Sequence, residues 1–189
     1  MLNNDLGLDV FASRAIYRDF VAGKIINKYE IIEGELQPSP KFRSLIDNFD
    51  QYRYLYSLLG FHIQSVGSDA FFITRDDRGE EYNDAAADIQ VLLTVIARGV
   101  YALGISPGIL LDPTAGLTAT QICEIGEMEE QAQIIKACGL RFPLSEPVNS
   151  RLVNRGVFFK TKQDRYILSA AGRHLFEQLI SAQKDIEEG

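Results

Sequence analysis

Residues 148–180, which read VNSRLVNRGVFFKTKQDRYILSAAGRHLFEQLI, decide the fold. Val148 and Leu152 lie four positions apart and therefore share one face of a short helix. Gly156 supplies the positive φ at which a helix commonly ends. The β-branched and aromatic residues that follow predict two strands joined by a polar turn at 162–164. Apolar side chains at helical spacing then predict a final helix.

This order of helix, glycine, strand, turn, strand and helix is typical of the end of a winged-helix domain. Ser169 follows the second strand and can N-cap the final helix. Residues 166–175 resemble the passage from wing to last helix in many such domains. The alternative interpretation is a β-hairpin on a helical domain that has no role in DNA binding.

The same order occurs earlier in the chain. Apolar residues from Phe42 to Leu59 step by three and four, which predicts one helix of about five turns that ends at Gly60. Residues 61–66 alternate between apolar and polar, as a half-buried strand does. Residues 67–69 form a turn, and residues 70–74 form the return strand.

We therefore expect an α+β, mainly helical chain with two tandem winged-helix domains, residues 1–80 and 81–189. The acidic run 75–84 is interpreted as a solvated linker between them. Residues 85–103 predict a long helix that is apolar over a wide face. This helix could be the centre of the second domain, a dimer interface, or both.

Two helix starts carry capping signals. Thr118 precedes a helical stretch and has Gln121 at the third helical position, which is the pattern of a capping box. Near the N-terminus, apolar residues from Phe11 to Val21 fall on one helical face, and Ser13 is a candidate N-cap.

Charge is distributed unevenly along the chain. The 189 residues carry a net charge of −7, which is unfavourable for a stand-alone nucleic-acid binder. Residues 141–175 nevertheless carry a net charge of +5. As a hypothesis, five residues of this segment form a DNA-facing edge: Arg151, Arg155, Lys160, Lys162 and Arg165. The alternatives are an ordinary solvated face and a patch that binds an acidic protein.

The sequence offers little catalytic chemistry. His62 and His174 have no assignable Ser, Cys or carboxylate partner, and there is no glycine-rich phosphate loop. Cys123 and Cys138 lack metal-site spacing. We expect no catalytic residues, no cofactor and no metal site. No basic segment precedes an apolar run at the N-terminus, and no apolar run approaches the about 18 residues of a membrane span, so we expect a cytoplasmic protein.

The chain resembles the MukE/MksE family of bacterial condensin accessory subunits. The resemblance lies in apolar patterns, glycines and segment lengths along most of the chain. The segments that carry it are residues 20–26, 49–59, 70–73, 88–103, 106–107, 117–122 and 152–168. The chain is shorter than the larger MukE proteins and has no long acidic C-terminal tail, which points to the compact MksE side. Val153 and Asn154 stand where MukE carries more basic residues.

The resemblance implies a non-catalytic, nucleoid-associated homodimer. Such a subunit binds the kleisin and, through it, an SMC-like ATPase, and supports chromosome segregation. No nucleotide site is expected, and any direct DNA contact is expected to be weak. The alternative function is a winged-helix transcription regulator, against which the acidic composition argues. A small-molecule enzyme is a third alternative, against which the missing chemistry argues.

Overall fold

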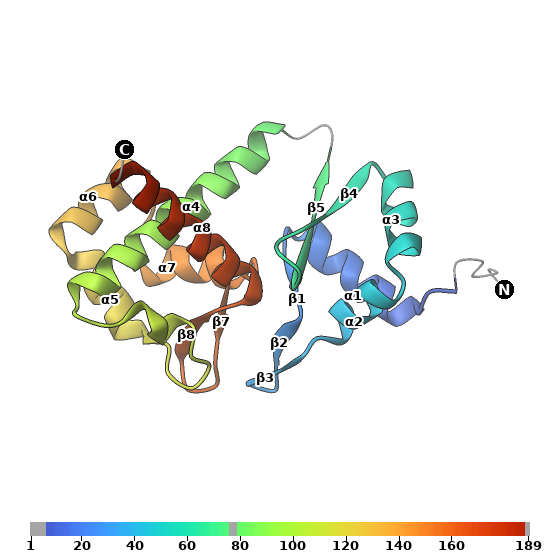
Figure 1. The fold of residues 1–189 in the computed structure, drawn as a ribbon, viewed down its shortest axis with the longest axis horizontal. Helices are drawn as coiled ribbons and strands as arrows, with labels where there is room; N and C mark the ends of the chain where they lie inside the picture. The colour runs from blue at the N-terminus through green and yellow to red at the C-terminus, as the bar shows by residue number, and fades with distance from the viewer. Residues whose placement is uncertain (1–6, 76–78, 188–189) are drawn as a thin grey trace.

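The computed structural model describes residues 7–75 and 79–187, which form two units side by side (Figure 1). The chain is α+β and mainly helical, as predicted. Each unit has its own hydrophobic cluster. One contains buried residues between Leu8 and Ile73, and the other contains buried residues between Leu92 and Phe176.

The N-terminal unit combines helices with a small sheet and a separate hairpin. Its elements are α1 (Val10–Val21), β1 (Ile26–Asn27), β2 (Tyr29–Ile32), β3 (Glu35–Pro38), α2 (Pro40–Asp47), α3 (Phe49–Leu58), β4 (Phe61–Ser65) and β5 (Ala70–Arg75). The sheet has the strand order β1-β5-β4, and β2 pairs with β3. Tyr52 and Tyr56 of α3 are buried against α1, where the rings of Phe20 and Tyr56 meet edge to face at 5.4 Å.

The C-terminal unit has a similar order of helix, short strand, helices and hairpin, built around a long helix. Its elements are α4 (Gly79–Ala102), η1 (Pro107–Leu110), β6 (Leu117–Thr118), α5 (Ala119–Glu127), α6 (Glu129–Ala137), α7 (Ser145–Pro147), η2 (Val148–Val153), β7 (Phe158–Lys160), β8 (Arg165–Leu168) and α8 (Ala170–Glu187). The sheet order is β6-β8-β7. In both sheets the strand that comes last in the chain therefore lies in the middle.

Helix α4 is the centre of the C-terminal unit. Leu92, Ile96 and Val100 are fully buried, and the helix packs against α5, α6, η2 and α8. Residues 84–102 are, by length and composition alone, long and apolar enough to cross a membrane. The expectation that no apolar run approaches that length was therefore wrong. The buried side chains explain the composition, because a core helix covered on several sides needs a wide apolar surface.

Several local predictions are confirmed. Thr118 and Gln121 form the expected capping box at the start of α5. Ser169 accepts a hydrogen bond from the Gly172 N–H at 3.0 Å at the start of α8. Both predicted hairpins are present as β4–β5 and β7–β8. Residues 148–153 are helical, but as a π-helix, in which the Asn154 N–H bonds to the Asn149 carbonyl, five residues earlier, at 2.9 Å.

The single helix expected from Phe42 to Leu59 was wrong, because the chain forms α2 and α3 with a break at Asn48. The side-chain amide of Asn48 donates to the Ser44 carbonyl at 3.0 Å. In a continuous helix, that carbonyl would accept the backbone N–H of residue 48. The side chain thus replaces a helical bond, as Asn side chains do at helix ends.

Two further boundaries differ from expectation. Asp9, rather than Ser13, caps α1, because its carboxylate accepts the Ala12 N–H at 2.7 Å. The prediction of a linker at 75–84 was wrong for its second part, because α4 already begins at Gly79. Residues 76–78 lie outside the described part of the chain.

Candidate functional site

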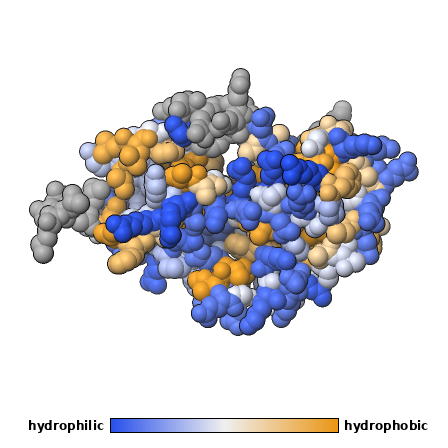
Figure 2. Space-filling view, turned by 180° about the vertical axis from the view of Figure 1, so that it is seen from behind, coloured by the Kyte–Doolittle hydropathy of each residue, from blue (hydrophilic) through white to orange (hydrophobic). Residues whose placement is uncertain are grey.

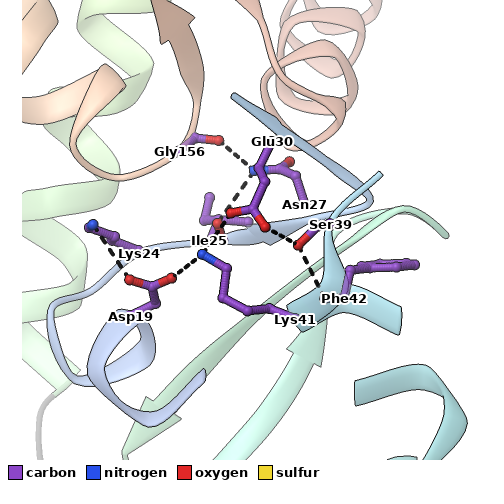
Figure 3. A network of polar contacts seen from close by, with 9 residues as sticks. All are labelled: Asp19, Lys24, Ile25, Asn27, Glu30, Ser39, Lys41, Phe42 and Gly156. Carbon is purple, nitrogen blue, oxygen red and sulfur yellow. Dashed lines mark hydrogen bonds and ion pairs between the residues drawn. The ribbon is translucent and has the colours of Figure 1, made fainter. Parts of the chain in front are cut away.

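The contact between the two units is organised around the side chain of Asn27 on β1 (Figure 3). Its amide nitrogen donates to the Gly156 carbonyl at 2.8 Å and to the Ile25 carbonyl at 3.3 Å. Its oxygen accepts the N–H of Ala171, in the first turn of α8, at 2.9 Å. Asn27 is only 4% exposed. One buried carboxamide therefore connects the N-terminal sheet to the segment between η2 and β7 and to the last helix of the C-terminal unit.

Gly156 allows the two backbones to approach closely beside Asn27. The Ile25 N–H donates to the Arg155 carbonyl at 2.9 Å across the same contact. A Cβ at residue 156 would lie 2.8 Å from the Ile25 carbonyl oxygen, and φ there is +76°. The glycine that the sequence assigned to ending a helix thus has a second role, because no larger residue fits between the units.

A charged network lines the N-terminal side of this contact (Figure 3). The ammonium of Lys41, at the start of α2, lies 2.7 Å from both Asp19 and Glu30. Burial would lower the pKa of Lys41, but hydrogen bonds to the two carboxylates outweigh it and raise that pKa. Glu30 also accepts a hydrogen bond from Ser39, the N-cap of α2, at 2.8 Å. The network fixes α1, β2 and α2 relative to one another.

The tip of the β2–β3 hairpin lies against the turn between β7 and β8. The Lys162 N–H donates to the Gly34 carbonyl at 3.3 Å. A Cβ at residue 34 would lie 2.7 Å from the Cβ of Lys162, and φ at Gly34 is +86°. Between the hairpin and β7 is a cavity of about 260 Å³, which Glu30, Lys41 and Lys160 help to line.

The five residues predicted to contact DNA do not form one continuous free edge. Arg151 pairs with Asp88 of α4 at 2.8 Å, and Lys160 pairs with Asp164 at 3.0 Å. Within the described ranges 7–75 and 79–187, Arg155, Lys162 and Arg165 form no ion pair. Two of these three face the N-terminal unit, since Arg155 lies beside Gly23 and Lys162 beside Gly34. DNA contact by this set stays a prediction.

A second surface feature is a hollow of about 660 Å³ between α1 and α3, whose lining is mainly apolar. It is lined in part by Val10, Phe11, Tyr17, Leu55 and Leu59. Phe11 is 83% exposed, and Leu59 is 53% exposed. Figure 2 shows hydrophobic side chains gathered at the end of the molecule that the N-terminal unit forms. We call this feature the α1/α3 groove.

Cationic side chains border the groove. Arg14 and Arg18 of α1 line it and form no ion pair within the part of the chain that the structure describes. In the same described part, no cluster of three or more His, Cys, Asp or Glu residues could hold a metal ion. The described surface thus offers contacts for another macromolecule.

A family model for the condensin complex protein MksE matches residues 12–180. The chain belongs to the MksE family. The match spans both units, including the contact at Asn27 and Gly156, and it confirms the resemblance seen in the sequence. No curated protein matches the chain. Membership of the MksE family places the protein among subunits of condensin complexes.

Sequence reasoning missed Asn27 and Lys41. The one available signal at Asn27 was a polar residue directly after the apolar pair Ile25-Ile26, where a strand would bury it. Its partners Gly156 and Ala171 lie 129 and 144 residues further on, so no local pattern could identify them. Lys41 gave no signal at all, because its carboxylate partners come from two other elements.

We expect Asn27→Ala to lower the free energy of unfolding by about 2–4 kcal/mol, because the Gly156 carbonyl and the Ala171 N–H would lose their buried partner. Urea unfolding followed by circular dichroism measures the loss. Asn154→Ala is the matched control, since Asn154 is exposed on the same side of the contact, and it should change the value by less than about 0.5 kcal/mol. Equal losses in the two variants would contradict the role of Asn27.

Proposed function

We propose that this MksE-family chain is a non-catalytic condensin subunit that binds the kleisin and, through it, an SMC-like ATPase. In this role it would support chromosome segregation at the nucleoid. The family match carries the proposal. Two observations support it: the exposed apolar groove on the N-terminal unit and the charge pairing around the cavity between the units. A subunit with these features acts, in this proposal, by binding other proteins through its surface.

We further propose that the two units are tandem winged-helix domains, residues 1–80 and 81–189. The supporting observation is the repeated order of helix, strand, helices and hairpin, with the last strand central in each sheet. The separate hydrophobic clusters support the division near residue 80. The hydrogen bonds of Asn27 then hold the two domains in a fixed arrangement.

The protein acts, in this proposal, as a homodimer that forms through the α1/α3 groove. Helix α4 was the other candidate for the dimer contact, but much of its apolar surface packs inside its own unit. The groove, in contrast, leaves Val10, Phe11, Tyr17 and Leu59 about half exposed or more. Exposed apolar surface of this kind marks interaction sites.

Affinity purification of the tagged chain from its native host tests the assignment as a whole. We expect a kleisin and a large coiled-coil ATPase to co-purify in stoichiometric amounts, as identified by mass spectrometry. Isolation of the chain with no partner, together with selection of one specific DNA site from random sequence, would instead favour the transcription regulator.

We expect Phe11→Asp to convert the dimer to a monomer, because a carboxylate would be buried in an apolar contact without a partner. Light scattering coupled to size exclusion measures the mass in solution. Tyr101→Asp is the matched control, because Tyr101 is 80% exposed but lies outside the groove. If the Phe11 variant remains dimeric at micromolar concentration, the groove is not the dimer contact.

Replacing Arg151, Arg155, Lys160, Lys162 and Arg165 together by Glu should abolish any salt-sensitive retention of DNA by the complex, since each lost phosphate contact weakens binding and lowers the salt slope by about 0.9. Gel-shift titrations at several salt concentrations measure both quantities. Replacing Arg151 and Lys160 alone should have a smaller effect, because both already pair with carboxylates. Unchanged retention by the fivefold variant would exclude this edge.

A further inference from the structure

Strand β4 is an outer strand of the N-terminal sheet, and one of its sides is open. It pairs with β5 from Phe61↔Arg75 to Ser65↔Phe71. The Val66 N–H donates to the Ala70 carbonyl at 2.9 Å. Because hydrogen-bonded pairs alternate along an antiparallel ladder, the N–H and C=O groups of Phe61, Ile63 and Ser65 point away from β5. Within residues 7–75 and 79–187, no backbone hydrogen bond covers that side.

The edge lacks the features that usually protect outer strands. Its sequence, Phe-His-Ile-Gln-Ser, contains no Lys, Arg, Asp, Glu or Pro, and its register with β5 is continuous without a bulge. The outer strands β1 and β6 have only two residues each. The outer strand β7 lies beside β2, and both line the cavity between the units. Strand β4 is thus the longest uncovered edge among the described strands.

Apolar surface continues from the edge onto α3. Leu58 and Leu59, which are separated from β4 by Gly60 alone, are 65% and 53% exposed. Phe61 and Ile63 are half-buried against the N-terminal cluster, whereas His62 and Gln64 point to the opposite face of the sheet. A strand added to β4 would extend the row of Phe61 and Ile63 with its own side chains. Its alternate residues would therefore be apolar.

We propose that β4 binds an extended segment of the kleisin, about five residues long, as an added strand of the N-terminal sheet. This inference rests on the proposed kleisin binding and assigns it a surface. The partner segment has apolar side chains at alternate positions and few charges, because β4 itself contains no charged residue, and the one cation beside it, Arg75, lies over the ring of Phe61. A phosphate backbone is a poor occupant for the same reason. A second copy of the chain is the proposed occupant of the α1/α3 groove instead.

Amide hydrogen exchange of the full chain, measured by NMR with and without purified kleisin, tests the added strand. Kleisin should slow exchange of the outward amides of Phe61, Ile63 and Ser65 by at least about tenfold. The amides of His62 and Gln64 face β5 and should change little. Unchanged exchange at the three outward amides in a saturated complex would overturn the inference but leave kleisin binding intact.

A pair of variants at one position gives a second readout. Ser65→Pro removes an outward N–H without removing a bond to β5, and proline is tolerated at a sheet edge. It should weaken kleisin affinity at least about tenfold, whereas Ser65→Ala, which keeps the N–H, should bind like the unmodified chain. Thermal unfolding of both variants checks that the sheet is intact.

The remaining outcomes separate the two proposals. If kleisin fails to bind the unmodified chain in any assay, the proposed function fails, and this inference fails with it. If the outward amides become protected when the chain alone is concentrated, a second copy occupies the edge, and the kleisin assignment is overturned. Equal affinity of the proline and alanine variants for kleisin would also overturn it.

Discussion

The carboxamide of Asn27 is the interaction on which the arrangement of this molecule depends. A single buried side chain satisfies the Gly156 carbonyl, just before β7, and an N–H in the first turn of α8. An amide can do this because it offers donors and an acceptor at once, and a buried site makes each unmade bond costly. Gly156 then allows the backbones to approach, and the Lys41 network fixes the elements that carry β1. The two units are therefore joined by buried hydrogen bonds at Asn27 and by the contact between Gly34 and Lys162.

The C-terminal unit covers only part of the surface of the N-terminal unit. The side that bears Asn27 and the β2–β3 hairpin is occupied by the C-terminal unit. Helices α1 and α3 carry exposed apolar side chains, and the outer side of β4 makes no backbone hydrogen bond within residues 7–75 and 79–187. Helix α3 exposes Tyr54 and Leu58, and its one cation, Arg53, pairs with Asp50 at 3.1 Å. The surface chemistry of this unit suits protein partners.

The sequence predicted those parts of the fold that depend on local chemistry. Thr118 and Gln121 marked the start of α5, and glycines and alternation marked both hairpins, because these signals need only neighbouring residues. It failed at Asn48, where one side-chain hydrogen bond divides a continuous apolar pattern into two helices. It placed five cations on one segment but could not place Asp88 beside Arg151, since that carboxylate comes from α4. The contact at Asn27 could not be predicted either, because its partners Gly156 and Ala171 are distant in the sequence.

The distance in sequence between Asn27 and its partners also bears on biosynthesis. A ribosome completes every element of the N-terminal unit well before it reaches Gly156 and Ala171, which follow Asn27 by 129 and 144 residues. During that interval the Asn27 side chain keeps only its bond to the Ile25 carbonyl, and the groups that later bond Arg155, Gly156 and Ala171 are left to water. Domains generally fold in order as they emerge, so the first unit folds with its future contact surface solvated. Docking of the two units is then among the last long-range events in the maturation of the nascent chain.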